Sequence, residues 1–318
     1  MTTDLRARSK GGEMESASVT PVPMEVAPEH YWWRWVTGLI ALGIVLWVAL
    51  LFARGNIEWA AAKDYLFDPR VMQGLRMTLV YSALAMLLGV LGGLLLAIMK
   101  LSANPVLRQI SNFYIWVFRG TPVLVQLLLW FNIALILPKL SVTIPLTGWS
   151  WTGDTNVYVT PFVAALLGLG LHQAAYMAEI VRAGIISVNK GQTEAAQALG
   201  LTPILTLRHV VLPQAMRIII PPTGNEFIGL LKTTSLVVVI SGNELMTVVQ
   251  NIYAENFLTV ELLFVASFWY LVLTSISSVA LSFLEDSFGQ QDRVRRSLGR
   301  KIIQDLRLTR SHIGGGES

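Results

Sequence analysis

The chain has 318 residues, of which 53% are hydrophobic and 14% are charged, and its formal net charge is +4. An ordinary soluble domain has roughly 25% charged residues, so this composition excludes a typical soluble protein. The positive mean hydropathy indicates a membrane protein with several spans. Cysteine is absent, which excludes disulfides and thiolate metal sites, and the small net charge gives no reason to expect nucleic acid as a partner.

The chain opens with a polar leader, residues 1–34, which is rich in Ser, Thr, Pro and Glu and which we expect to be disordered. An apolar run at 35–53 follows, behind an aromatic cluster suited to a membrane interface. We interpret this run as an uncleaved anchor. A cleaved signal sequence is the alternative, but the leader is long and the run exceeds the roughly 7–15 residues of a signal core.

Five further stretches approach the roughly 20 apolar residues that a helix needs to cross the hydrocarbon core. They lie near 75–99, 114–137, 159–186, 222–240 and 258–284. The sequence therefore predicts an all-α integral membrane protein, a polytopic bundle of about six transmembrane helices. Residues 74–284 form its main transmembrane domain.

The Lys and Arg residues in the loops, in the tails and near the ends of the spans set the orientation, because short cytoplasmic loops carry an excess of them. Eighteen fall on the side of the two termini and five on the other. This predicts a cytoplasmic N-terminus and a cytoplasmic C-terminus. The tail at 285–318 is basic and shows one apolar stripe at helical spacing, so we expect it to rest on anionic membrane lipid.

Ionisable residues inside spans are costly to bury and are functional candidates for that reason. Glu226 and Lys232 lie six residues apart on roughly opposite helix faces, so each needs a partner on another helix or a cavity. Glu179 and Arg182 can pair locally at i,i+3. For that pair a structural ion pair is the favoured interpretation.

The segment from Glu194 to Arg217, EAAQALGLTPILTLRHVVLPQAMR, lies on the cytoplasmic side and is too charged to be buried in lipid. It predicts two short helices. The first ends at Gly200, a residue suited to a left-handed cap. The second begins at Pro203 and is stopped by Pro213.

This segment resembles the EAA loop of permease subunits of ATP-binding-cassette importers, whose pattern is E-A-A-x3-G-x9-I-x-L-P. The matching residues are Glu194, Ala195, Ala196, Gly200, Leu212 and Pro213, with Val210 where Ile is usual. The stretch FRGTPVLVQLLLWF, which begins at Phe118 at the head of the span near 114–137, looks like the polar amino acid branch of these permeases (the histidine, glutamate, glutamine and arginine type).

The resemblance implies a type I importer permease core of five helices, to which this chain adds an N-terminal span. It implies a second permease subunit, identical or paralogous, two cytoplasmic ATPase subunits and an extracytoplasmic amino acid-binding protein, in a bacterial inner membrane. The permease itself would catalyse no reaction and would hold no cofactor. ATP and Mg²⁺ would be bound by the ATPase. The stretch from Gly224 to Ser235 has the glycine spacing of a phosphate-binding loop, but its Lys232 stands two positions too late for that motif, so we expect no ATP site there.

The resemblance identifies the coupling loop, and the polar and ionisable residues inside the spans supply the candidates for the substrate pathway. In the coupling loop at 190–217, the residues expected to contact the ATPase are Glu194, Ala195, Ala196, Gly200, Arg208, Leu212 and Pro213. The candidates for the substrate pathway are Gln126, Glu179, Asn225, Glu226, Lys232 and Ser235. Packing within the bundle is the alternative interpretation for this second set.

Two other classes of protein remain as alternatives. A stand-alone secondary transporter or channel would work without ATP. A membrane enzyme would need a catalytic constellation, and neither HExxH nor GxSxG occurs in the sequence.

Overall fold

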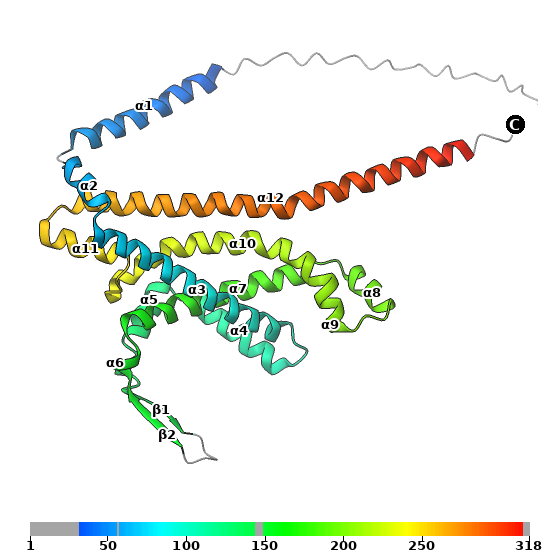
Figure 1. The fold of residues 1–318 in the computed structure, drawn as a ribbon, viewed down its shortest axis with the longest axis horizontal. Coiled ribbons are helices and arrows are strands. Elements are labelled where there is room, and N and C mark those ends of the chain that lie inside the picture. The colour runs from blue at the N-terminus through cyan, green and yellow to red at the C-terminus, as the bar shows by residue number, and fades with distance from the viewer. Residues whose placement is uncertain (1–31, 56, 144–148, 314–318) are drawn as a thin grey trace, which may run out of the picture. The chain divides into compact units, whose positions relative to one another are not determined.

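The computed structural model describes residues 32–55, 57–143 and 149–313, and these are almost entirely helical (Figure 1). The chain divides into two units, which meet at Asn56 and are described separately. The first contains α1 (Trp32–Arg54), an apolar helix of 23 residues. At about 1.5 Å per residue it is long enough to cross the hydrocarbon core, and it covers the predicted anchor at 35–53. The predicted leader lies outside the described residues up to residue 31.

The second unit holds the remaining elements. In chain order they are α2 (Trp59–Leu66), α3 (Pro69–Leu101), α4 (Pro105–Gly120), α5 (Val123–Phe131), η1 (Ile133–Leu135), β1 (Lys139–Thr143), β2 (Ser150–Asp154), α6 (Thr155–Tyr158), α7 (Pro161–Ile186), α8 (Lys190–Ala198), α9 (Pro203–Thr206), η2 (Leu207–Val211), α10 (Leu212–Thr233), η3 (Thr234–Ile240), α11 (Leu245–Asn256) and α12 (Thr259–Ile313).

Four helices of this unit begin with the same local device, a capping side chain followed by proline. Asp68, Asn104, Thr160 and Thr202 cap α3, α4, α7 and α9, and each accepts a hydrogen bond from a backbone N–H of the first turn. Proline fits the first helical position because the N–H that it lacks has no partner there. These helix starts are therefore fixed by the sequence itself.

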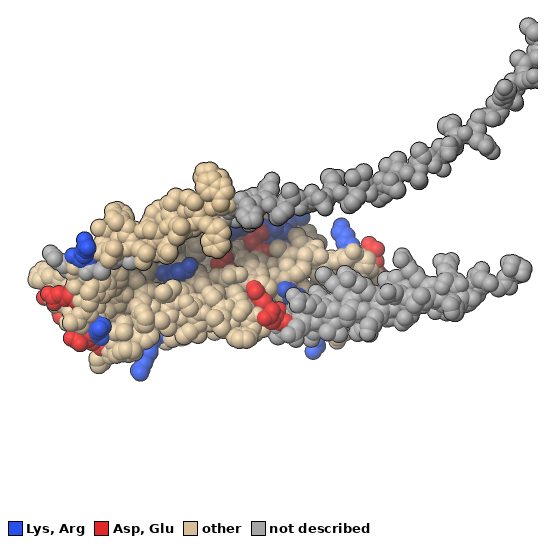
Figure 2. All heavy atoms as spheres, turned by 90° about the horizontal axis from the view of Figure 1, so that it is seen from above, with Lys and Arg blue, Asp and Glu red and all other residues tan. Residues whose placement is uncertain are grey.

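Long apolar helices dominate the chain, as the sequence predicts. Five are long and apolar enough to cross a membrane, or up to six if the bent pair α4 and α5 counts as one span. Figure 2 shows one face on which charged side chains are sparse over the middle and gather toward the ends. The prediction of an all-α bundle with about six spans is confirmed.

The third predicted span, near 114–137, is wrong as a single straight helix. The axes of α4 and α5 meet at 102°. Pro122 stands at the break, and the preceding Thr121 is extended, as residues before a proline usually are. The Nε2 group of Gln126 lies 3.0 Å and 3.1 Å from the carbonyl oxygens of Phe118 and Thr121. The bend is therefore stable because its exposed carbonyls find a donor within the protein.

The fifth and sixth predicted spans differ from the structure in their extent. The helix that contains the fifth begins before residue 222, since α10 starts at Leu212 and includes Pro221 and Pro222. The sixth is part of α12, which has 55 residues and runs without a break into the predicted tail. The side chains of the tail, and its expected contact with lipid, lie outside the described residues.

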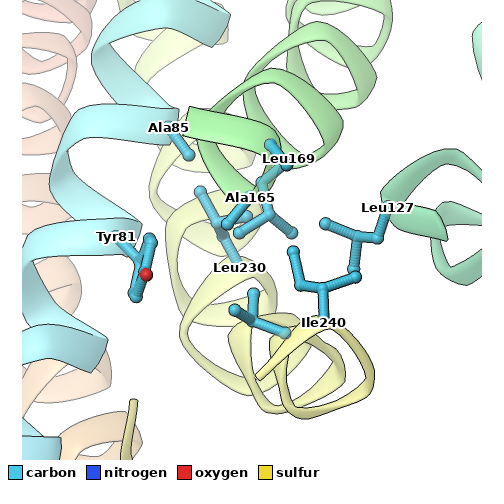
Figure 3. Close-up of a cluster of buried hydrophobic side chains, with 9 residues drawn as sticks. Tyr81, Ala85, Leu127, Ala165, Leu169, Leu230 and Ile240 are labelled. Carbon is cyan, nitrogen blue, oxygen red and sulfur yellow. The ribbon is translucent and has the colours of Figure 1, made fainter. Parts of the chain in front are cut away.

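The core of the bundle is the packing of α3 on α7. A Cβ added to Gly93 would lie 2.4 Å from the Cβ of Met177, so the two helices touch closely at this glycine. Figure 3 shows the neighbouring apolar cluster, in which Tyr81 of α3, Leu169 of α7 and Ile240 of η3 point toward a common centre. This packing fixes the separation of α3 and α7.

Candidate functional site

The predicted coupling loop is a helical hairpin formed by α8, α9 and η2, at the end of the bundle opposite α11 (Figure 1). Gly200 closes its first helix with φ +81°. The N–H groups of Gly200 and Leu201 donate to the carbonyls of Gln197 and Ala196 at 2.9 Å and 3.1 Å. These two bonds form a Schellman cap, and the predicted left-handed cap at Gly200 is confirmed.

The prediction that Pro213 stops the second helix is wrong. From Pro203 to Thr233 the chain passes through α9, η2 and α10 without a break. Pro213 stands in the first turn of α10, directly after the π-helical turn η2, in which the N–H of Leu212 donates to the carbonyl of Leu207. In a regular α-helix the proline ring would clash with the carbonyl four residues earlier, and the wider π turn provides room for it.

Most of the predicted contact residues lie on the outside of the hairpin. Glu194, Ala195, Arg208, Leu212 and Pro213 are exposed. Ala196 is buried, so it contributes through packing within the loop.

Two large apolar side chains mark the tip of the hairpin. Leu199 is 82% exposed and Ile204 is 77% exposed. The tip therefore offers apolar area close to a carboxylate and a guanidinium, a combination typical of a protein interface.

An ion cluster ties α3 to α7, seven residues before the end of α7. Both Nε and Nη2 of Arg182 donate to Glu179 Oε2, at 3.0 Å and 2.9 Å, and Lys100 of α3 donates to Glu179 Oε1. The predicted i,i+3 pair is confirmed. Lys100 adds a link between residues 79 positions apart in the chain. Glu179 is therefore engaged through both of its oxygens.

A second polar group lies around the middle of α7. Gln126 of α5 is buried, and its Nε2 lies 3.3 Å from Nδ1 of His172. Among the described residues its Oε1 has no hydrogen-bond partner. A buried acceptor without a donor costs about 1–3 kcal/mol, so this oxygen is free to accept a hydrogen bond from a ligand that carries a donor.

The same helix connects to α10 and α4. Gln173 donates to Glu226 Oε2 at 3.1 Å, and the guanidinium of Arg119 lies 4.9 Å from the centre of the Tyr176 ring. Arg119 stands in the last turn of α4. The expectation that Glu226 finds a partner on another helix is confirmed.

The remaining pathway candidates do not join this group. Asn225 donates to the Pro221 carbonyl at 3.2 Å, and Ser235 donates to the Lys232 carbonyl at 2.7 Å. Asn225 and Lys232 are exposed seven residues apart on one face of α10. Within the described part of the chain, no hydrogen bond or ion pair links them to Gln126 or Glu226.

Several residues of these two groups are missed by the sequence analysis. His172, Gln173 and Tyr176 recur at spacings of one and three residues on the fourth span, a polar stripe that could have been noticed. No local pattern reveals Lys100, because its partner lies on a different helix.

The chain is similar to known transport proteins. The family model described as "Binding-protein-dependent transport system inner membrane component" matches residues 89–290. The arginine transport system permease protein ArgU of Corynebacterium glutamicum is 41% identical over 276 residues, which cover 86% of this chain and 85% of that protein. The glutamine transport system permease protein GlnP of Escherichia coli is 34% identical and covers 72% of this chain and 97% of its own length.

The fold also matches solved structures. A crystal structure of an amino acid ABC transporter with histidines contains a chain that is 35% identical, with a TM-score of 0.63, covering 73% of this chain and all of its own. A chain of the MetNI methionine ABC transporter is 19% identical with a TM-score of 0.54, a likeness of fold alone.

Proposed function

The chain belongs to the family of inner membrane components of binding-protein-dependent transport systems and is a permease subunit of an amino acid ATP-binding-cassette importer, and we propose how it is coupled to ATP and which class of amino acid it carries. The observation that carries the proposal is the capped helical hairpin at 190–217, whose exposed tip stands at one end of a membrane bundle with polar groups inside it.

The hairpin is the coupling element in this proposal. Leu199 and Ile204 enter an apolar groove of a cytoplasmic ATPase subunit, and Glu194 and Arg208 make charged contacts at its rim. Closure of two ATPase subunits around ATP and Mg²⁺ then pushes the hairpin, and α10 moves with it because α9, η2 and α10 are continuous.

The substrate in this proposal is a cationic amino acid such as arginine. Two facts support it. The 41% identical relative is named as an arginine permease. The carboxylate of Glu226, bonded to Gln173 between α7 and α10, can attract a cation within an apolar segment. Asn225 and Lys232 occupy a face of α10 that is too polar for lipid, so this face borders the pathway or a second permease.

The complex that this mechanism requires has further subunits. It contains a second permease chain, two ATPases and an extracytoplasmic solute-binding protein, in an inner membrane with both termini of this chain in the cytoplasm. The excess of Lys and Arg on the side of the termini supports that orientation.

Co-purification with the ATPase tests the coupling step. Leu199→Ser and Ile204→Ser each remove a large apolar side chain from the tip, and we expect at least about tenfold weaker retention of the ATPase, as for a truncated interface anchor. Leu135→Ser is a matched control, since Leu135 is 83% exposed but lies in η1, outside the hairpin. Normal retention in both tip variants contradicts the proposed contact.

Binding of L-arginine tests the substrate class. In the assembled complex, Glu226→Gln should weaken L-arginine binding by about tenfold or more and affect a neutral amino acid far less, because it removes a charge but keeps the shape. Equal losses for both ligands would show that Glu226 has a general structural role.

A further inference from the structure

Helix α11 is bracketed by two strained turns at the end of the bundle opposite the coupling loop (Figure 1). Ser241 precedes it with φ 55° and Phe257 follows it with φ 63°, and among the described residues these are the two non-glycine positions with positive φ. A bulky residue in this conformation is a genuine outlier. Such outliers cluster at binding sites and switch regions, so the turns point to a function for α11.

The second turn holds an aromatic ring out into the surroundings. Phe257 is 86% exposed. Its neighbour Asn256 accepts a hydrogen bond from the N–H of Leu258 at 3.0 Å and donates one to the Tyr65 hydroxyl of α2 at 3.1 Å. Because both flanks of the turn are fixed, the ring is displayed in one direction instead of folding back onto the protein.

A polar hollow lies between the first turns of α3 and helix α11. It has a volume of about 280 Å³, and its polar lining residues are Arg70, Gln73, Asn243, Asn251 and Glu255. The guanidinium of Arg70 is 3.9 Å from the carboxylate of Glu255, and both side chains are more than half exposed. Figure 2 shows charges of both signs gathered at this end of the molecule.

We propose that this surface, the α11 face, is where the extracytoplasmic solute-binding protein docks. The α11 face consists of Arg70, Gln73, Asn243, Asn251, Glu255 and Phe257. The inference rests on the proposed function, which requires such a partner on the side away from the coupling loop.

The chemistry of the α11 face favours a water-soluble protein as its occupant. Lipid chains offer no partner for three amides and an ion pair, so the hollow faces water or another protein. A projecting aromatic residue at the end of a helix that carries polar side chains is typical of an interface that depends on a few anchor residues. Such an interface suits a partner that must bind and leave in every transport cycle. The partner should supply an apolar pocket for the ring, and an anion and a cation placed to meet Arg70 and Glu255.

The test uses the permease–ATPase complex in nanodiscs and a purified solute-binding protein that stimulates ATP hydrolysis by the unmodified complex. The measured quantity is the Kd of that protein, loaded with L-arginine, for the complex. Phe257→Asn removes the ring but keeps the turn, since Asn tolerates the left-handed conformation. We expect it to raise the Kd by about tenfold or more, while Phe257→Tyr stays within about twofold. Glu255→Lys should raise the Kd by about threefold to tenfold, more at low salt than at high salt.

Phe113→Ala serves as the control, because Phe113 is a similarly exposed ring on α4. Unchanged binding by both Phe257→Asn and Glu255→Lys overturns the proposal and leaves the importer function intact. Loss of binding in Trp149→Ala with normal binding in Phe257→Asn overturns it in favour of the β1–β2 hairpin. Dissociation of the permease pair in Phe257→Asn overturns it in favour of a second permease as the occupant. If no solute-binding protein stimulates the unmodified complex, the proposed partner itself is wrong and the inference falls with it.

Discussion

The hydroxyl of Tyr270 on α12 donates a 2.7 Å hydrogen bond to Glu244, a carboxylate that is completely buried at the start of α11. Glu244 also accepts from the N–H groups of Met246 and Thr247 and from the Thr247 hydroxyl. One side chain therefore caps α11 and connects it to α12, and it anchors the helix that bears the α11 face.

Removing this carboxylate should destabilise the outer end of the bundle. Glu244→Ala leaves two N–H groups and two hydroxyls without their acceptor in a dry site, and we expect a loss of about 2 kcal/mol or more in the free energy of unfolding. Tyr270→Phe leaves the cap in place and should cost about 0.5–1.5 kcal/mol. Thermal unfolding of the purified permease measures both variants. A larger loss for Tyr270→Phe would contradict the assignment of Glu244 as the cap.

The stability of the protein should depend on pH through the same residue. Burial raises the pKa of Glu244 above its ordinary value of 4.5, and the bonds from Met246, Tyr270 and Thr247 lower it by less. Between the two pKa values the folded protein holds a proton that the unfolded chain has lost, so the contribution of Glu244 is complete below pH 4.5 and falls as the pH rises through the raised pKa.

Glu244→Gln cannot titrate and isolates this effect. The unfolding temperature of the unmodified protein minus that of Glu244→Gln should decrease as the pH rises from 4.5 through the raised pKa of Glu244. A difference that grows with pH would mean that the hydrogen bonds outweigh burial and that the folded pKa is lowered.

The left-handed cap of the coupling loop gives a third prediction. Gly200→Val places a β-branched side chain at φ +81° and should misdirect α9, whereas Gly200→Asn tolerates that conformation. Apart from the two adjoining residues of the chain, no atom lies within 4 Å of a Cβ built at Gly200. The two variants therefore differ in backbone strain and not in crowding. We expect ATPase co-purification to be lost in the Val variant and mostly kept in the Asn variant. Equal retention would contradict the role of the cap.

The ion cluster of α3 and α7 predicts an order of effects. Glu179→Gln leaves Lys100 and Arg182 close together with no anion, whereas Lys100→Met leaves the Glu179–Arg182 pair intact. Because all three side chains are partly exposed, we expect losses of about 1–3 kcal/mol for Glu179→Gln and less than about 1 kcal/mol for Lys100→Met. Unfolding in detergent checks the order, and the reverse order would contradict this account of the cluster.

The close contact of α3 and α7 predicts that Gly93 tolerates no larger side chain. Gly93→Ala would bring its Cβ within 2.4 Å of Met177 and force the helices apart, at a cost of about 1–3 kcal/mol. Gly120→Ala is the matched control, since no neighbouring atom lies within 4 Å of a Cβ there. Equal unfolding temperatures for the two variants would show that the helices adjust without strain.

The sequence by itself determined the features that depend on nearby residues. A capping side chain followed by proline starts a helix wherever it occurs, so the starts of α3 and α9 follow from Asp68 and Thr202 with their prolines. The left-handed cap at Gly200 and the pair of Glu179 with Arg182 depend on neighbours within four positions. The lengths of the apolar runs set the number of spans.

Only the tertiary structure decided which faces of the spans meet. In a soluble protein the apolar stripe of a helix marks its buried face, but a helix in lipid is apolar on all sides, so periodicity does not reveal its neighbours. The bonds from Gln173 to Glu226 and from Tyr270 to Glu244 join different helices through this packing. Pro213 shows another limit, because the π turn before it lets the helix continue through a residue whose local chemistry predicts a stop.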